Sequence, residues 1–117
     1  MNSKTIDSIS PQVLYILLSL AVKKRHGYEI MKQVKLDSNG KISMGPGTLY
    51  GAIKRMLKDG WIKEAGMSNR RKYYSLTEFG RKNLSSELQR YDDILIQARK
   101  KEIIKNPLAA KLLFRYV

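Results

Sequence analysis

The feature that most restricts the fold is a stretch of ten mostly apolar residues near the N-terminus, Val13 to Val22. It is too short to span a bilayer, for which a helix needs about 20 residues. Ser10 and Pro11 precede it; Ser is a favoured helix N-cap and Pro is tolerated at the first helical position. The stretch therefore predicts a helix over 11–24 that is buried on nearly all sides, with the rest of the chain packed around it.

Two further helices follow in the pattern of apolar residues. Ile30, Met31 and Val34 share one face of a short helix expected over 28–35, and the turn-forming residues 37–40 end it. Residues 41–43 are compatible with a very short strand. Gly and Pro at 45–47 then open a third helix, which Asp59 and Gly60 close. Its expected core positions are Leu49, Ile53, Met56 and Leu57.

The remainder of the chain predicts a hairpin and one long helix. Strands are expected over 61–65 and 71–76, joined by a loop over 66–70 whose Gly, Ser and Asn favour turns. Thr77 is the expected N-cap of a helix over 78–105, which Asn106 and Pro107 would stop; Pro107 would open a short final helix. An a/d heptad seam, the pattern that pairs helices, runs along the long helix. It consists of Leu84, Leu88, Tyr91, Leu95 and Ala98.

This order of elements predicts a mainly α fold with a small β-hairpin. Three helices followed by a hairpin form a winged helix-turn-helix, in which the third helix enters a major groove. We expect a winged helix-turn-helix domain over 1–76, then a C-terminal dimerisation helix and short tail over 77–117. The length of 117 residues suits one such domain with one attached element.

The charge balance indicates a polyanionic partner. The chain has 23 Lys and Arg against 10 Asp and Glu, a formal net charge of +13. Residues 1–76 hold 14 of the basic and 5 of the acidic residues, so most of the excess lies in the expected winged domain. Such a field attracts nucleic acid or anionic membrane. The basic residues have no exposed apolar face opposite them on one helix, which disfavours a membrane-surface role.

Enzymatic and metal-binding functions find little support. The chain has no Cys and one His, which excludes thiolate metal sites and ordinary zinc clusters. His26 is expected to cap or precede the second helix, and Trp61 to pack in the core. No arrangement of Ser, His and Asp suits nucleophilic catalysis. We therefore expect no catalytic residues, no metal, no cofactor and no enzyme. The lack of Cys and of a signal peptide suits a cytoplasmic protein.

The exposed face of the third helix carries the first group of candidate DNA contacts. Tyr50, Lys54 and Lys58 stand at i, i+4 and i+8 and form one stripe. The free backbone N–H groups of the helix N-terminus suit a phosphate. Gly51 in mid-helix costs roughly 1 kcal/mol relative to Ala, which a close contact would explain. The candidates on this helix are Gly47, Thr48, Tyr50, Lys54, Arg55 and Lys58.

The tip of the hairpin carries the second group: Asn69, Arg70, Arg71 and Lys72. Arg at such a tip can lie along phosphates or enter a minor groove. A basic helix face alone is commonly just solvated. Basic groups on the third helix and on the adjacent wing would instead form one continuous surface, which favours DNA binding.

Three segments resemble the PadR family of transcriptional regulators. They are His26-Gly27-Tyr28-Glu29-Ile30, residues 45–62 beginning Gly-Pro-Gly-Thr-Leu-Tyr, and residues 70–80, Arg-Arg-Lys-Tyr-Tyr-Ser-Leu-Thr-Glu-Phe-Gly. Their order and spacing match over about residues 10–82. Other winged-helix families share the Leu-Thr-x-x-Gly ending, but not this opening of the third helix with His-Gly-Tyr before it.

The resemblance implies a homodimer that binds a palindromic promoter site on double-stranded DNA, usually as a repressor. It implies recognition-helix contacts by Thr48, Tyr50 and Lys54, a phosphate contact by Tyr28, and wing contacts by Arg70 and Arg71. It also implies a small aromatic or phenolic effector at the dimer interface. Tyr91 is the sole aromatic of the expected long helix after Phe79, and that helix has no Trp to stack a flat ligand. A winged-helix module that binds RNA or docks a protein remains the alternative reading.

Overall fold

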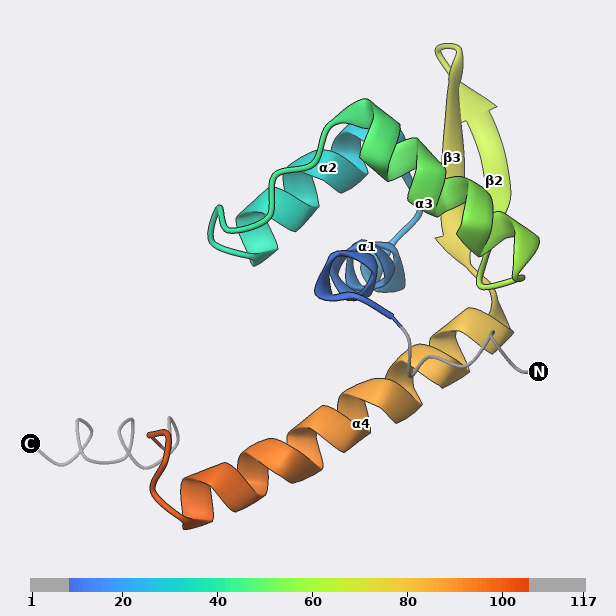
Figure 1. Cartoon of the computed structure of the whole chain (residues 1–117). Helices are drawn as coiled ribbons and strands as arrows, with labels where there is room; N and C mark the ends of the chain where they lie inside the picture. The colour runs from blue at the N-terminus through green and yellow to red at the C-terminus, as the bar shows by residue number, and fades with distance from the viewer. Residues whose placement is uncertain (1–8, 106–117) are drawn as a thin grey trace, which may run out of the picture. The chain divides into compact units, whose positions relative to one another are not determined.

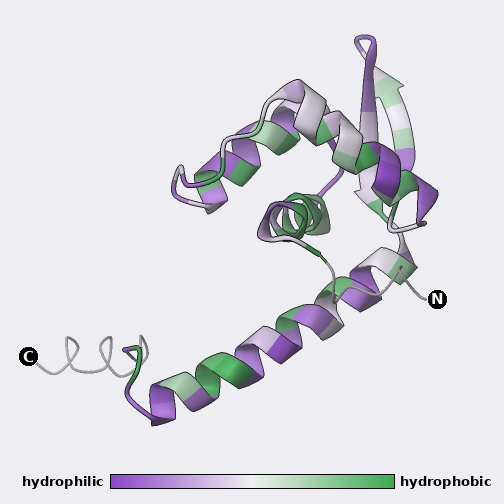
Figure 2. Cartoon of the chain, viewed as in Figure 1, coloured by the Kyte–Doolittle hydropathy of each residue, from purple (hydrophilic) through white to green (hydrophobic). Residues whose placement is uncertain are grey.

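The computed structural model describes residues 9–105, and its first helix, α1 (Pro11–Val22), is central as predicted. Ser10 caps it by accepting a hydrogen bond from the Val13 N–H at 3.3 Å. Leu14, Ile16, Leu17 and Leu20 are buried, and α1 packs against α2 and β3. Figure 2 shows α1 apolar nearly all round, and Figure 1 shows it nearly end-on with α2 and α3 over one side.

A two-residue strand, β1 (Arg25–His26), leads into α2 (Gly27–Asp37). β1 pairs antiparallel with β3, so the short strand expected at residues 41–43 was misplaced. The backbone N–H groups of Lys41 and Ile42 form local hydrogen bonds instead of strand pairing. The buried Ser38 hydroxyl accepts from the Ile42 N–H at 3.0 Å, and the Lys41 N–H donates to the Ser38 carbonyl at 3.1 Å.

The third helix, α3 (Pro46–Lys58), has the predicted inner face. Leu49, Ile53 and Met56 are buried, Leu57 is half-buried, and Ala52 joins them inside. Gly60, with φ of 80°, reverses the chain after the C-cap Asp59, as its sequence position indicated.

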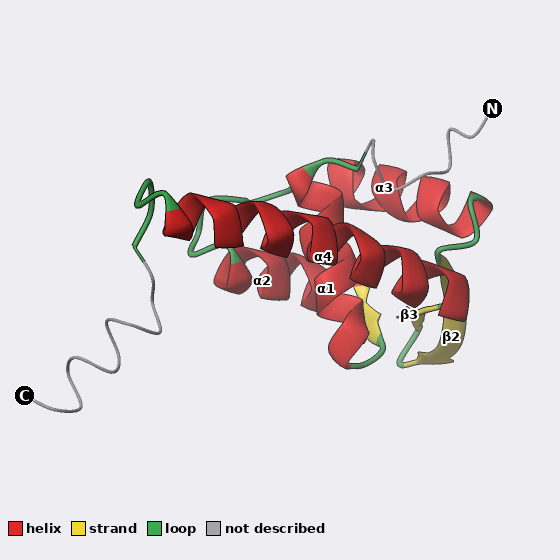
Figure 3. Ribbon diagram, turned by 90° about the horizontal axis from the view of Figure 1, so that it is seen from below, coloured by secondary structure: helices red, strands yellow, loops and turns green. Residues whose placement is uncertain are grey.

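The hairpin consists of β2 (Ile62–Ser68) and β3 (Arg71–Leu76), and the sheet order is β1-β3-β2. β3 has the predicted bounds, whereas β2 extends three residues further than expected, because the loop predicted over 66–70 is a two-residue turn of Asn69 and Arg70. A register shift lies between Glu64 and Met67, and Gly66 there has φ of 101°. This bulge lets β2 continue past the glycine to the tip. Strands in the described residues occur in this one small sheet (Figure 3).

The last described helix, α4 (Glu78–Lys100), begins where predicted and ends five residues early. Thr77 caps it by accepting from the Gly80 N–H at 2.9 Å. Glu102 has φ of 59°, and the Ile103 N–H bonds back to the Ala98 carbonyl at 2.9 Å. This is a Schellman-type stop without the usual Gly. Asn106, Pro107 and the expected short final helix lie outside the described residues.

The chain divides after Ser85, within α4, into two compact units. The first contains the sheet, α1 to α3 and the first residues of α4, including the buried Leu84. The second contains the rest of α4. In residues 9–105, no helix is long and apolar enough to cross a membrane.

Candidate nucleic-acid interface

The outer face of α3 is exposed along its whole length. Tyr50 and Lys54 are open to solvent, as are the other predicted contacts on this helix: Gly47, Thr48, Arg55 and Lys58. A side chain at Gly51 would meet nothing within 4 Å. No contact inside the described protein therefore accounts for this mid-helix glycine, which leaves the backbone open to a molecule on the outer side.

The N-terminus of α3 offers unpaired backbone donors. Its N-cap, Gly45, makes no side-chain capping hydrogen bond, and Pro46 at the first position has no N–H. The first backbone bond in the helix runs from Leu49 to the Gly45 carbonyl, at 3.1 Å. The N–H groups of Gly47 and Thr48 precede it on exposed residues, where the helix dipole favours an anion.

The wing tip is a strained turn that carries charge. Asn69 and Arg70 both have positive φ, 51° and 64°, the pattern of a type I′ hairpin. Gly is the usual second residue of such a turn, and a bulky side chain there is disfavoured. Arg70 is nevertheless present and exposed, and it is followed by exposed Arg71 and Lys72. Lys72 lies 3.6 Å from Glu64 across the hairpin, so part of its charge is locally balanced.

A cleft of about 450 Å³ joins these parts. Its lining includes Tyr28 from α2, Tyr50 from α3, and Arg70, Arg71 and Lys72 from the wing. These five predicted site residues, which come from three segments of the chain, thus gather around one hollow. Arg55 does not join them. It lines a different hollow, with Met56 and Trp61.

Gly27 allows the close approach of α2 and α3. A Cβ atom at this position would overlap the Tyr50 hydroxyl and lie 2.7 Å from the Cζ atom of the same ring. Tyr50 therefore rests over the start of α2, immediately before Tyr28. In the sequence, Gly27 stood out only as part of the His-Gly-Tyr segment that resembles the PadR family. The Gly-Tyr dipeptide gave no sign of a contact 23 positions away.

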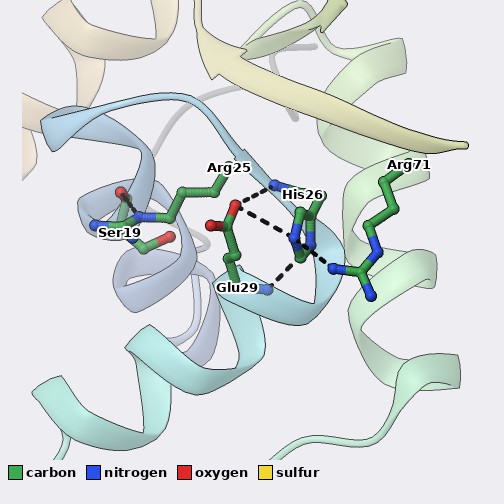
Figure 4. Close-up of polar contacts among 5 residues, drawn as sticks. All are labelled: Ser19, Arg25, His26, Glu29 and Arg71. Carbon is green, nitrogen blue, oxygen red and sulfur yellow. Dashed lines mark hydrogen bonds and ion pairs between the residues drawn. The ribbon is translucent and has the colours of Figure 1, made fainter. Parts of the chain in front are cut away.

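His26 joins the wing to the start of α2 (Figure 4). Its ring Nδ1 lies 3.3 Å from the Glu29 backbone N–H, while the His26 N–H donates to the Glu29 carboxylate at 3.1 Å. This capping box confirms the prediction that His26 caps the second helix. Its Nε2 lies 3.0 Å from Nη1 of Arg71. No local pattern in the sequence indicates this last contact, which spans 45 positions.

The capping box also sets the protonation of Glu29. The hydrogen bond from the His26 backbone holds the pKa of that carboxyl below its usual value. Burial acts in the opposite direction and raises the pKa, while electrostatic interaction with His26, Lys23 and Arg25 lowers it further. A lowered folded-state pKa means that Glu29 stabilises the fold above its unfolded pKa. This contribution is lost as the pH falls through the folded pKa. Burial raises the pKa of Tyr74, and charge on Tyr50 and Glu64 acts in the same direction.

The predicted dimer seam changes character along α4. Leu84 is buried within the first unit, while Leu88 and Ala98 are half-buried. Tyr91 and Leu95 are about two-fifths exposed, at 41% and 40%.

Among the described residues, no group of three His, Cys, Asp or Glu could hold a metal ion.

Comparison with known proteins identifies the family. The model of the transcriptional regulator PadR-like family matches residues 16–86. A transcriptional regulator from Clostridium thermocellum has a similar structure, with a TM-score of 0.65, 27% identity, and coverage of 82% of this chain and 99% of that one. A PadR family transcription regulator from Clostridium difficile matches with a TM-score of 0.66, 28% identity, and coverage of 78% and 97%.

A third structure is that of Bacillus subtilis PadR in complex with operator DNA. Its TM-score is 0.57 and its identity 25%, over 65% of this chain and 45% of that one. The likeness therefore covers less than half of that longer protein. Because the family match spans more than half of this chain, from α1 to the early part of α4, the chain belongs to the PadR-like family of transcriptional regulators.

Proposed function

We propose that the protein is a homodimeric, sequence-specific DNA-binding repressor. The observation that carries the proposal is the cleft where Tyr28, Tyr50, Arg70 and Arg71 come together beside the exposed face of α3. Tyrosine hydroxyls and guanidinium groups donate hydrogen bonds to phosphate oxygens. A surface that combines such donors with a recognition helix suits one DNA backbone running between the wing and α2.

In this proposal, α3 lies in the major groove and reads base edges. Thr48 and Tyr50 are exposed in the N-terminal half of α3, the part of a recognition helix that contacts bases, and Lys54 is exposed one turn after Tyr50. Arg55 and Lys58 stand further along α3, and we expect Lys58 to contact the DNA backbone. The Bacillus subtilis relative was crystallised with operator DNA, which supports the same use of this fold here.

The apolar seam of α4 supports the proposed dimer. Leu88, Tyr91, Leu95 and Ala98 repeat at heptad spacing, and pairing would remove their exposed surface from water. Two recognition helices would then reach successive major grooves about 34 Å apart, which requires a palindromic site. Residues 1–76 would bind the DNA and residues 77–117 would join the chains.

A small aromatic or phenolic effector at the dimer interface forms a further part of the proposal. Exposed Tyr91 is the aromatic side chain on the seam of α4 that could stack on it. Trp61, the single Trp of the chain, is the natural fluorescence reporter. If titration with phenolic acids and aromatic drugs changes neither its emission nor the DNA affinity, the effector is excluded.

The experiment is a fluorescence-anisotropy titration of DNA from upstream of the protein's own gene, with random duplex as competitor and at two salt concentrations. We expect specific binding that survives competition and weakens steeply with salt. Lys54→Ala should weaken specific binding more than random binding, whereas Arg70→Ala should weaken both about equally. Lys35→Ala, at the other end of α2 from Tyr28, is the charge-matched control and should change little.

Two results would contradict the proposal. Equal, salt-labile affinity for every duplex, with no site recovered by selection from a random DNA library, would mean that the protein does not recognise sequence. Preference for duplex RNA of the same length would favour the RNA-binding reading of the same basic surface.

A further inference from the structure

The ring of His26 receives two hydrogen-bond donors, one on each nitrogen. The Glu29 N–H points at Nδ1 from 3.3 Å, and the Arg71 guanidinium meets Nε2 at 3.0 Å. The Glu29 carboxylate, an acceptor, lies further from Nε2, at 3.6 Å. Figure 4 shows the ring between the two donors, one from the first turn of α2 and one from β3. His26 has 6% of its surface exposed, so water does not replace either partner readily.

A neutral imidazole cannot accept both hydrogen bonds. One of its nitrogens carries the hydrogen and the other has the lone pair, so only one can act as acceptor. Arg has donors only and can therefore bond to Nε2 only when the hydrogen sits on Nδ1. The cap on Glu29 needs the opposite tautomer. The two contacts compete for a single lone pair.

The Arg71 contact has the stronger claim to that lone pair. Its donor is charged and its distance is shorter, and charge-assisted hydrogen bonds are the stronger class. With the hydrogen on Nδ1, the start of α2 gives up the bond from the Glu29 N–H to the ring and keeps the other half of the capping box. The His26 backbone N–H still donates to the Glu29 carboxylate at 3.1 Å whichever tautomer is present.

We propose that His26 is a positioning residue for DNA binding, whose Nε2 accepts a hydrogen bond from Arg71 and holds that guanidinium against the N-terminus of α2. This inference rests on the proposed DNA-binding function. A guanidinium has five N–H donors, so one bond to His26 leaves four for a phosphate. Arg71 is an exposed side chain that would otherwise sample many rotamers, and fixing it before binding lowers the entropic cost of the contact.

The surroundings of the ring make it a firm anchor. The Tyr73 ring packs edge-on against it with centroids 5.3 Å apart, and His26 and Tyr73 are paired across β1 and β3. Arg25, its neighbour in β1, is tied to α1 by a 2.7 Å bond from Nε to the Ser19 carbonyl. The acceptor that meets Arg71 is thus fixed to the core of the first unit.

The first test is a double-mutant cycle on DNA affinity. His26→Asn keeps an N-cap side chain, since Asn caps helices well, but is too short to reach Arg71. We expect His26→Asn to weaken specific DNA binding about tenfold in the wild-type background and to have almost no effect in the Arg71→Ala background. Arg70→Ala, the adjacent wing variant, is the matched control, and the loss caused by His26→Asn should persist in it. An equal loss in the Arg71→Ala background would overturn the proposal.

The second test needs no DNA and remains decisive if His26→Asn folds poorly. His26 is the single histidine, so its two ring nitrogens are resolved in a ¹⁵N spectrum of the whole chain. We expect the Nδ1–H tautomer in the wild type and a shift to the Nε2–H tautomer in Arg71→Ala, when the cap takes the lone pair. The same tautomer in both proteins would overturn the link between His26 and Arg71. Failure to find a specific DNA site would instead overturn the proposed function, and the spectrum would distinguish the two.

Discussion

The two units of the chain differ in what covers their apolar side chains. In the first, Leu17, Ile30 and Leu49 have essentially no exposed surface, because α1 to α3 and the sheet enclose them. In the second, the seam residues Tyr91 and Leu95 are 41% and 40% exposed on α4. One unit thus folds on contacts within the single chain. The other presents a helix whose apolar seam suits a second copy, and this contrast is the physical basis for proposing that the second unit forms the dimer.

The largest effect is expected from a charge on the seam. Leu95→Asp should raise the monomer–dimer dissociation constant at least about a hundredfold, since the new carboxylate would be buried unpaired in the dimer. Ile96→Asp makes the same chemical change one residue away, on the side of the helix turned from the seam, and should leave the dimer intact. Light scattering across a concentration series measures both. If the Leu95→Asp protein were still a dimer, the seam of α4 would not be the dimer interface.

The next effect lies inside the first unit, at the junction of the hairpin with α4. A Cβ at Gly80 would overlap the Trp61 backbone carbonyl, which also accepts from the Thr77 hydroxyl at 3.1 Å. Because the backbone at Trp61 or Gly80 must move to make room for the methyl group, Gly80→Ala should destabilise the fold by about 2 kcal/mol. Urea unfolding followed by Trp61 fluorescence measures this. Unchanged stability would show that this junction is looser than the structure indicates.

The smallest effect is expected at Gly51, on the outer face of the same unit. A Cβ there meets nothing in the described protein, so Gly51→Ala should stabilise α3 by about 0.5–1 kcal/mol. The added methyl group would stand on the face proposed to enter the groove and should lower DNA affinity severalfold. Thermal unfolding and anisotropy on one preparation test both halves. Increased stability with unchanged affinity would place the DNA away from Gly51.

Local sequence patterns were enough to predict most of the helices. The capping residues Ser10 and Thr77 and the apolar spacing of α3 act within a few positions, and each is confirmed. Gly60 at the end of α3 belongs to the same class. Signals of this kind depend on backbone geometry and on the helical period, and a single sequence contains both.

The features that the sequence could not reveal depend on contacts between distant segments, or on residues that adopt backbone conformations disfavoured for their type. β1 exists because β3 offers it an edge, and the Arg71 contact with His26 spans 45 positions. Arg70 and Glu102 adopt left-handed conformations that their residue types disfavour, so the tight wing turn and the early end of α4 had no sequence signal. Arg55 is exposed as predicted, but helical spacing alone did not show that it borders a different hollow from Tyr50.

The most direct test of the account is the mass of the complex with a selected operator duplex, measured by light scattering during gel filtration. We expect two chains on one palindromic duplex. A half-site duplex should be bound far more weakly, because both wings and both α3 helices are needed. A complex of one chain per duplex, with the same affinity for the half-site as for the whole, would contradict the assignment of pairing to α4 and of operator recognition to the dimer.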